Sequence, residues 1–295
     1  MKANTLMSSS TSVDTATGDL VFADCGSIGT HQGASNMGST APHSAWRVGW
    51  ASITGTRHTA QGVGCEDSLA ARAHSTSELH IALADGVSQG ARGEIASRAL
   101  VQHCTAMPVD VSPAEWLQGA EPAVQAALTA VTDGRGAATL VAAWLGGDGG
   151  AILTRVGDCR VYRWGAGAIA GDVQVTQERP DQSFASLGES PPFGVDPHNP
   201  ARMVGLGKMQ GADAYELWHT QLEVGEGLIL CSDGVHDVLD NLAMGQILQT
   251  TLAQSSLGAS TEEDLMRAAQ CMAAQAQWLG SDDDIAVMVV VRVKA

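Results

Sequence analysis

The order in which strand-like and helix-like segments follow one another is the feature of this sequence that most restricts its fold. Apolar runs typical of strands come first, followed by two helical stretches, further strands, two more helical stretches and a last strand. Strands and helices therefore come in blocks and do not alternate one by one. This order favours antiparallel sheets with helices packed on their outer faces over a doubly wound parallel sheet. The sequence predicts an α+β fold.

The individual elements are predicted from hydrophobic periodicity and from turn residues. Residues 285–293 (IAVMVVVRV) form a continuous apolar run that is typical of a strand buried on both faces. Ser112 and Pro113 are a favourable N-cap and first residue for a helix. The predicted strands are 46–53, 79–84, 138–145, 151–156, 160–164, 215–222, 227–231 and 285–293, and the predicted helices are 93–104, 113–131, 241–254 and 261–278.

Composition divides the chain into two parts. Residues 1–44 are rich in Ser, Thr, Gly and Ala and contain few large apolar residues, so we expect a flexible N-terminal tail. Residues 45–295 carry the apolar runs and form the predicted folded domain. Within this domain, residues 178–212 are dominated by Pro, Gly, Asp, Ser and Asn. A loop of this length inside a compact domain is usually functional.

The charge of the chain excludes some classes of partner. Asp and Glu outnumber Lys and Arg by 32 to 16, which gives a net charge of −16. A surface of this charge repels phosphate backbones and anionic lipids, so we expect neither nucleic-acid nor membrane binding. The six cysteines show no metal-binding or disulfide spacing, and no secretion signal is recognisable at the N-terminus. We therefore expect reduced thiols and a cytoplasmic protein.

Acidic residues recur at the ends of predicted strands. A carboxylate at the mouth of a buried strand is partly desolvated, and several such carboxylates repel one another unless a cation lies among them. Ligation by oxygen alone suits Mg²⁺ or Mn²⁺. The alternative is that Asp-Gly is simply a common turn dipeptide. The positions concerned are Glu66, Asp67, Asp85, Asp158, Asp233 and the run Asp282, Asp283 and Asp284.

Seven segments, taken in order, resemble the metal-dependent protein phosphatase (PPM, type 2C) family of Ser/Thr phosphatases. Each segment alone is weak evidence, but together they span residues 50–293 in the order that the family shows. The resemblance points to the bacterial branch of the family. The segments are GTRHTAQGVGCEDS (55–68), ALADGVSQGARGEIASRAL (82–100), GAATLVAA (136–143), VGDCRVYRW (156–164), HNPARMVGLG (198–207), LILCSDGVHDVLDN (228–241) and SDDDIAVMVV (281–290).

The resemblance implies a four-layer α-β-β-α sandwich, with two antiparallel sheets flanked by helix pairs and a short flap at about 178–212. It also implies two Mn²⁺ or Mg²⁺ ions in a cleft at one edge of the sheets, and a third, weaker ion. Asp85 would bridge the two ions and the Gly86 carbonyl would help to bind one of them. The remaining implied ligands are Asp233 and Asp283, Glu66 and Asp67 through metal-bound waters, and Asp158 and Asp237 for the third ion.

The activity implied by the resemblance is hydrolysis of phosphoserine and phosphothreonine in proteins. A metal-bridging hydroxide would attack phosphorus, with Asp85, Asp233 and Asp283 as the catalytic carboxylates. The protein would act as a monomer on substrates of a bacterial Ser/Thr kinase and so reverse kinase signalling. The alternative is a pseudo-phosphatase that binds phosphoprotein or metal without turnover.

The sequence departs from the family pattern at the residues that meet the substrate phosphate. Many members carry Arg four residues before the Glu of the first motif, where this chain has Gly62. Arg57 or His58 is predicted to bind substrate instead, although both are equally compatible with ordinary surface positions. Some members have His directly after the Asp-Gly pair, where this chain has Val87. The run of three aspartates leaves open whether Asp283 or one of its neighbours is the ligand.

Overall fold

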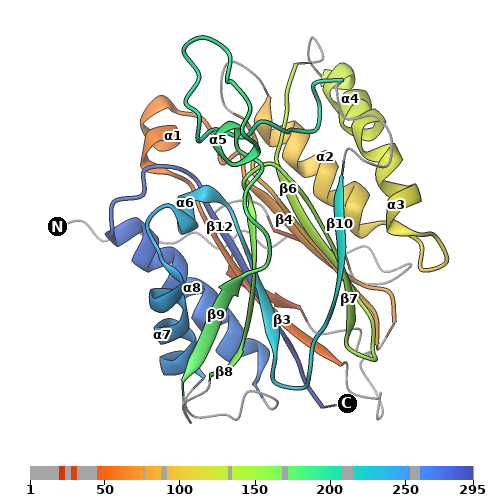
Figure 1. Ribbon diagram of the computed structural model, residues 1–295, viewed down its shortest axis with the longest axis vertical. Coiled ribbons are helices and arrows are strands. Elements are labelled where there is room, and N and C mark those ends of the chain that lie inside the picture. Colours follow the sequence, from red (N-terminus) through yellow and green to blue (C-terminus); the bar gives the residue numbers. More distant parts are fainter. Residues whose placement is uncertain are drawn as a thin grey trace.

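The computed structural model describes residues 20–23, 28–31, 45–75, 77–87, 92–131, 135–167, 172–207, 215–252 and 260–294. These residues form two antiparallel sheets that pack face to face (Figure 1). The first sheet has the strand order β1 (Leu20–Ala23), β4 (Ser68–Ala73), β5 (Leu79–Ala84), β6 (Leu140–Leu145), β7 (Gly150–Val156) and β10 (Glu216–Gln221). The second has the order β2 (Ile28–His31), β3 (Trp46–Ile53), β12 (Ile285–Arg292), β11 (Gly227–Cys231), β8 (Arg160–Ala166) and β9 (Val173–Gln177).

Helices cover the outer face of each sheet, which completes the four-layer sandwich (Figure 1). On the first sheet, α2 (Gly93–Thr105) packs against β4 and β5 and against α4 (Ala120–Val131). On the second sheet, α8 (Glu262–Trp278) packs against β3 and β12, and α7 (Asn241–Thr251) packs against β9. The predicted α+β class, with two antiparallel sheets and outer helices, is confirmed.

The core explains why the last strand is apolar along its whole length. Met288 and Val290 of β12 lie in the apolar cluster between the two sheets. Val287 and Val289 lie in the cluster between the second sheet and helices α7 and α8. Because β12 is covered on both faces, its two alternating sets of side chains are both removed from water.

The structure differs from the sequence prediction at several elements. Strands β1 and β2 fall inside residues 1–44, which were predicted to be a flexible tail, and form edge strands of the two sheets by pairing with β4 and β3. Strands β4 and β9 were not predicted, because SLAARA and VQVTQ contain too few large apolar residues to form a clear pattern. The helix predicted over 113–131 is divided into α3 (Pro113–Trp116), a 3₁₀ turn (Leu117–Gly119) and α4. Gly119, a poor helix former, ends that turn.

The cysteines only partly follow the prediction of reduced thiols. Cys104, Cys159, Cys231 and Cys271 are free, whereas Cys65 is disulfide-bonded.

In the described part of the chain, no helix has both the length and the apolar character that crossing a bilayer requires.

Candidate metal centre

The acidic residues predicted from the sequence come together at one end of the sandwich. Asp67 precedes β4 and Asp85 follows β5, and the pairing of Ser68 with Ala84 places these two chain segments side by side. In the second sheet, Asp233 follows β11 and Asp283 lies just before β12, its antiparallel neighbour. Asp158 joins them from the end of β7. Antiparallel pairing brings the end of one strand beside the start of the next, so distant segments supply one cluster.

Burial, together with neighbouring charges, raises the pKa values of four of these carboxylates, those of Asp67, Asp85, Asp158 and Asp233. The pKa of Asp85 is well above its usual value because of burial and because of the charges of Asp233, Asp67, Asp158 and Asp283. Burial and the neighbouring charge of Asp158 raise the pKa of Asp233 to about 7. Burial also raises the pKa of Asp158 to about 7. Burial and neighbouring charges therefore destabilise the ionised forms of Asp85, Asp158 and Asp233.

Two oxygen atoms in the cluster lack hydrogen-bond partners. Oδ1 of Asp67 and Oδ1 of Asp158 are buried and accept no hydrogen bond from the described residues. The other oxygen of Asp67 accepts a hydrogen bond of 2.7 Å from Ser232. A buried carboxylate oxygen without a donor is costly, and a hard divalent cation would satisfy it. The donor set of this cluster therefore fits Mg²⁺ or Mn²⁺.

Among the described residues, no group of three or more His, Cys, Asp or Glu side chains is placed so that it could hold a metal ion. The carboxylates nevertheless lie within electrostatic range of one another. Water molecules between a cation and the carboxylates would be compatible with this arrangement, since Mg²⁺ usually retains several waters.

Glycine at position 86 is required by close backbone packing. A Cβ at Gly86 would lie 2.4 Å from the carbonyl carbon of Gly93, in the first turn of α2, and 2.7 Å from the carbonyl oxygen of Glu66. A Cβ at Gly93 would lie 2.9 Å from Oε1 of Glu66. Hence only glycine allows the turn after β5, the start of α2 and the Glu66 loop to meet.

The three consecutive aspartates have different surroundings. Both oxygens of Asp284 accept hydrogen bonds, from the backbone N–H of Gly55 (2.7 Å) and from that of Glu66 (2.6 Å). Asp282 is exposed. Asp283 is half-buried and close enough to Asp233 to raise the pKa of that residue. Asp283 and Asp284 thus both lie within electrostatic range of the cluster, since Asp284 raises the pKa of Asp67.

Arg57 and His58 are adjacent in the short helix α1 (Thr56–Gln61) but lie in different environments. The side chain of Arg57 is 43% exposed, and its Nη2 donates a hydrogen bond of 2.5 Å to Asp283. His58 is only 2% exposed. Its Nδ1 lies 2.8 Å from Asp284 and its Nε2 lies 3.5 Å from Glu66. Arg57 is therefore open to a ligand, whereas the imidazole of His58 is enclosed between two carboxylates.

Asp237 lies at the edge of the cluster, just after α6 (Asp233–His236). Its side chain is 70% exposed, and a hydrogen bond from His236 lowers its pKa. Its charge contributes to the raised pKa of Asp158, so the two residues predicted to share the third ion are neighbours. His236 also bonds the Asp158 carbonyl oxygen through Nε2 at 3.0 Å.

Glu121, which the sequence did not indicate as a functional residue, holds the flap, here residues 178–207 within the described chain. Glu121 on α4 is buried, and its carboxylate accepts hydrogen bonds from the backbone N–H of Gly205 (2.8 Å) and of Gly207. Val204 exchanges two backbone hydrogen bonds of 2.9 Å with Ala138. No pattern in the sequence marks Glu121, since a single Glu at the start of a helix reads as an ordinary solvated residue.

Comparisons with known proteins agree with this geometry. The family model of protein phosphatase 2C matches residues 54–269. Among curated proteins, none matches the sequence. The fold is similar to that of the Ser/Thr phosphatase PstP/Ppp of Mycobacterium tuberculosis, with 21% identity, a TM-score of 0.62, and coverage of 84% of this chain and 99% of that one.

Two further solved structures share the architecture. A PstP catalytic domain in complex with two manganese ions is 22% identical, with a TM-score of 0.60 and coverage of 84% and 99%. Stp1 of Staphylococcus aureus is 19% identical, with a TM-score of 0.62 and coverage of 84% and 95%. The family match spans most of the chain and includes the segments that supply the acidic cluster from Glu66 to Asp237, whereas Asp283 lies beyond its end. This chain belongs to the protein phosphatase 2C family.

Proposed function

We propose that the protein hydrolyses phosphoserine and phosphothreonine in protein substrates, with Mn²⁺ or Mg²⁺ held by the carboxylates around Asp85. The observation that carries the proposal is the cluster itself. Asp67, Asp85, Asp158, Asp233 and Asp283 converge from both sheets, and their burial is unfavourable without a cation. Membership of the protein phosphatase 2C family supports the same activity.

We assign the acidic residues to central and outer positions of the proposed metal site. Asp85 interacts with carboxylates of both sheets, so we assign it the central position, with the Gly86 carbonyl beside it. Asp233 and Asp283 complete the site from the second sheet. The outer ligands are Glu66 and Asp67, acting through water, and Asp158 with Asp237 for a third, weaker ion. Divalent cations bound there supply an activated water and neutralise charge on the phosphoryl oxygens.

We assign recognition of the substrate phosphate to Arg57. Its guanidinium is half exposed beside the cluster, and its Nη2 donates a hydrogen bond to the Asp283 carboxylate. A guanidinium can bind phosphate through two parallel hydrogen bonds. His58, which the sequence also suggested for this role, is enclosed and has no surface for a substrate. We assign it a positioning role through Asp284 and Glu66.

In the cell, we propose that the protein reverses phosphorylation by a bacterial Ser/Thr kinase, as a cytoplasmic monomer. The acidic balance of the chain, −16, supports a protein substrate over nucleic acid. The same balance favours phosphorylated segments that carry basic residues, because opposite charge speeds encounter.

The test is release of phosphate from a phosphothreonine peptide and of p-nitrophenol from p-nitrophenyl phosphate. We expect turnover with Mn²⁺ or Mg²⁺ and none with EDTA. Arg57→Ala should raise the KM for the peptide, whereas Arg267→Ala, an exposed arginine on α8, should not. Binding of the phosphopeptide without release of phosphate under all metal conditions would overturn the proposal in favour of a pseudo-phosphatase.

A further inference from the structure

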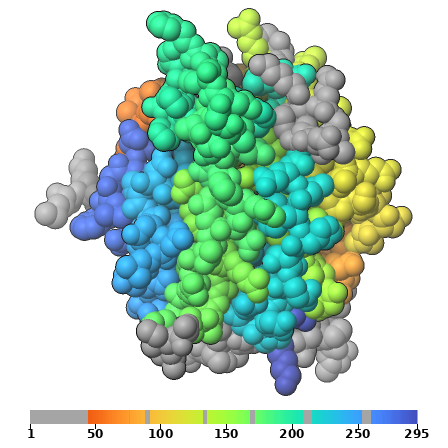
Figure 2. All heavy atoms as spheres, in the orientation of Figure 1, coloured from red at the N-terminus to blue at the C-terminus, as the bar shows by residue number. Residues whose placement is uncertain are grey.

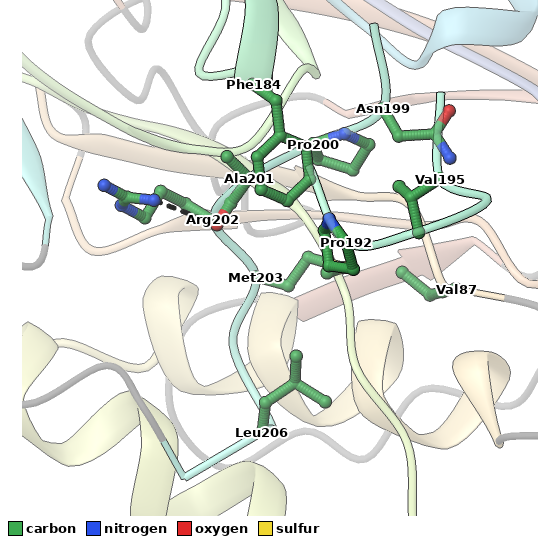
Figure 3. Close-up of a pocket in the computed structure, with 10 residues that line it drawn as sticks. All are labelled: Val87, Phe184, Pro192, Val195, Asn199, Pro200, Ala201, Arg202, Met203 and Leu206. Atoms are coloured by element: carbon green, nitrogen blue, oxygen red, sulfur yellow. Dashed lines mark hydrogen bonds between the residues drawn. The ribbon is translucent and has the colours of Figure 1, made fainter. Parts of the chain in front are cut away.

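A cavity of about 520 Å³ lies between the flap and the turn that follows β5 (Figure 3). Val87 forms one wall, and it follows Asp85 by only two residues. The other walls come from the flap, including Phe184, Val195 and Met203 (Figure 3). Its volume is in the range of roughly 300–1,000 Å³ that is typical of ligand pockets. The cavity is therefore a largely apolar space next to the acidic cluster.

The flap that forms these walls is held by its own hydrogen bonds. The backbone N–H of Ala185, in the short helix α5 (Phe184–Leu187), donates to the carbonyl of Pro197 at 2.7 Å. The N–H of Ala201 donates to the carbonyl of Gln182 at 2.8 Å. Arg202 forms an ion pair with Glu189 across the flap. The walls are thus fixed relative to one another, and the cavity exists before any ligand binds.

Apolar side chains are also exposed on the surface of the flap. Phe193 is fully exposed, and Leu187 and Leu206 are exposed as well. Figure 2 shows the flap, in green, projecting at the top of the molecule. Phe193 lies between two residues that line the cavity, Pro192 and Val195. Exposed apolar residues gathered next to a pocket mark a binding surface.

We propose that this cavity receives an apolar side chain of the substrate polypeptide, close in sequence to the phosphorylated serine or threonine. The proposal rests on the proposed function, because the occupant is the chain that presents its phosphate to the Asp85 cluster. An extended chain advances at most about 3.6 Å per residue. Val87 is two residues from Asp85, so a substrate residue one to three positions from the phosphorylated one can enter the cavity. Val87, Ala201 and Met203 would then determine specificity.

The test uses phosphothreonine peptides of equal charge with a Gly-Ser background and a single leucine. The leucine is placed in turn at each of the three positions before and after the phosphothreonine. We expect leucine at one position or more to raise kcat/KM by about tenfold or more over the leucine-free peptide, as burial of one apolar side chain allows. Equal kcat/KM for all peptides would overturn the proposal.

A matched pair of variants tests whether the preference for leucine-containing peptides arises in the cavity. Ala201 lines the cavity, whereas Ala185 is exposed on the same flap and does not. Ala201→Trp should fill the cavity and bring the ratio of leucine to leucine-free kcat/KM close to one, while Ala185→Trp should keep the ratio. Each ratio is taken within one enzyme, so a general loss of activity cancels. A preference that persists in Ala201→Trp would overturn the proposal.

The two proposals can fail separately. If neither p-nitrophenyl phosphate nor any peptide is hydrolysed with Mn²⁺ or Mg²⁺, the proposed function fails. If all peptides are hydrolysed alike, only the cavity assignment fails. Occupation of the cavity by a second copy of the chain would appear as concentration-dependent dimerisation that Ala201→Trp abolishes, together with equal rates for all peptides, and would also overturn the assignment.

Discussion

At the scale of single residues, neighbours in the sequence take opposite roles at the start of β12. Asp283 joins the acidic cluster and contacts Arg57. The side chain of Asp284 points into the protein interior, where Gly55, His58 and Glu66 surround its carboxylate. We infer that Asp284 fixes the loop that carries Glu66 and helix α1. We assign it a supporting role in the site.

Substitution of Asp284 tests this supporting role. Asp284→Ala leaves two buried backbone N–H groups and the His58 ring without their acceptor, and relieves some repulsion of Asp67. We expect the free energy of unfolding to fall by about 2–4 kcal/mol in urea denaturation. The exposed neighbour Asp282 provides the control, because Asp282→Ala should change the free energy of unfolding by no more than about 0.5 kcal/mol. A similar effect of both substitutions would contradict the role given to Asp284.

Three other carboxylates are expected to affect activity first. Asp85→Asn, Asp233→Asn and Asp283→Asn should each lower kcat/KM at limiting Mn²⁺ by about 100-fold or more, since even indirect partners of a metal commonly cost 10–100-fold. Asp158→Asn should mainly raise the Mn²⁺ concentration needed for half-maximal rate. Asp110→Asn, an exposed carboxylate outside the cluster, serves as the control. Normal activity in all three cluster variants would exclude the metal site.

At the scale of elements, the flap is attached to the outer helix layer through Glu121 of α4. Glu121→Ala should release the N–H groups of Gly205 and Gly207 and loosen one wall of the cavity. We expect the KM for a phosphopeptide to rise severalfold, with little change for p-nitrophenyl phosphate. Glu121→Gln, which keeps one acceptor oxygen, should recover part of the loss, and the exposed Glu115→Ala should have no effect. Equal losses on both substrates would indicate a general structural role.

The sequence predicted elements well where burial gives a clear pattern and poorly elsewhere. The run at β12 is apolar throughout because both faces are covered, so its strand was evident. Strand β4 contains three alanines, of which Ala70 packs towards α2 and Ala71 packs between the two sheets, and such small side chains leave no periodic signal. Acidic residues at strand ends predicted which loops would meet. The buried role of Asp284 could not be predicted, because it depends on two backbone N–H groups whose positions only the fold determines.

At the scale of the whole molecule, acid should weaken the fold through His80 of β5. Burial, with the charges of His74 and Arg72, lowers the pKa of His80 to about 3. Between this value and the ordinary value of 6.5, the unfolded chain binds a proton that the folded protein does not. The contribution of His80 is therefore complete above pH 6.5 and is lost as pH falls, by about 1.4 kcal/mol per pH unit.

Comparison of the wild type with His80→Gln isolates this effect. The difference in unfolding free energy between them, measured by urea denaturation from pH 7 to pH 4.5, should change with pH in favour of the variant. Contributions of the acidic cluster are common to both proteins and cancel, because His80 lies near the start of β5 and the cluster lies beyond the other end of that strand. A difference that is independent of pH would show that His80 titrates normally.

The acidic cluster draws on both sheets, and this has a mechanical consequence. Asp67 and Asp85 belong to loops of the first sheet, whereas Asp233 and Asp283 belong to the second, and the hydrogen bond from Ser232 to Asp67 joins the two sides directly. A cation shared by such carboxylates would fasten one half of the sandwich to the other. Loading the site should then slow the separation of the two layers, so that ion occupancy and the lifetime of the native state rise together.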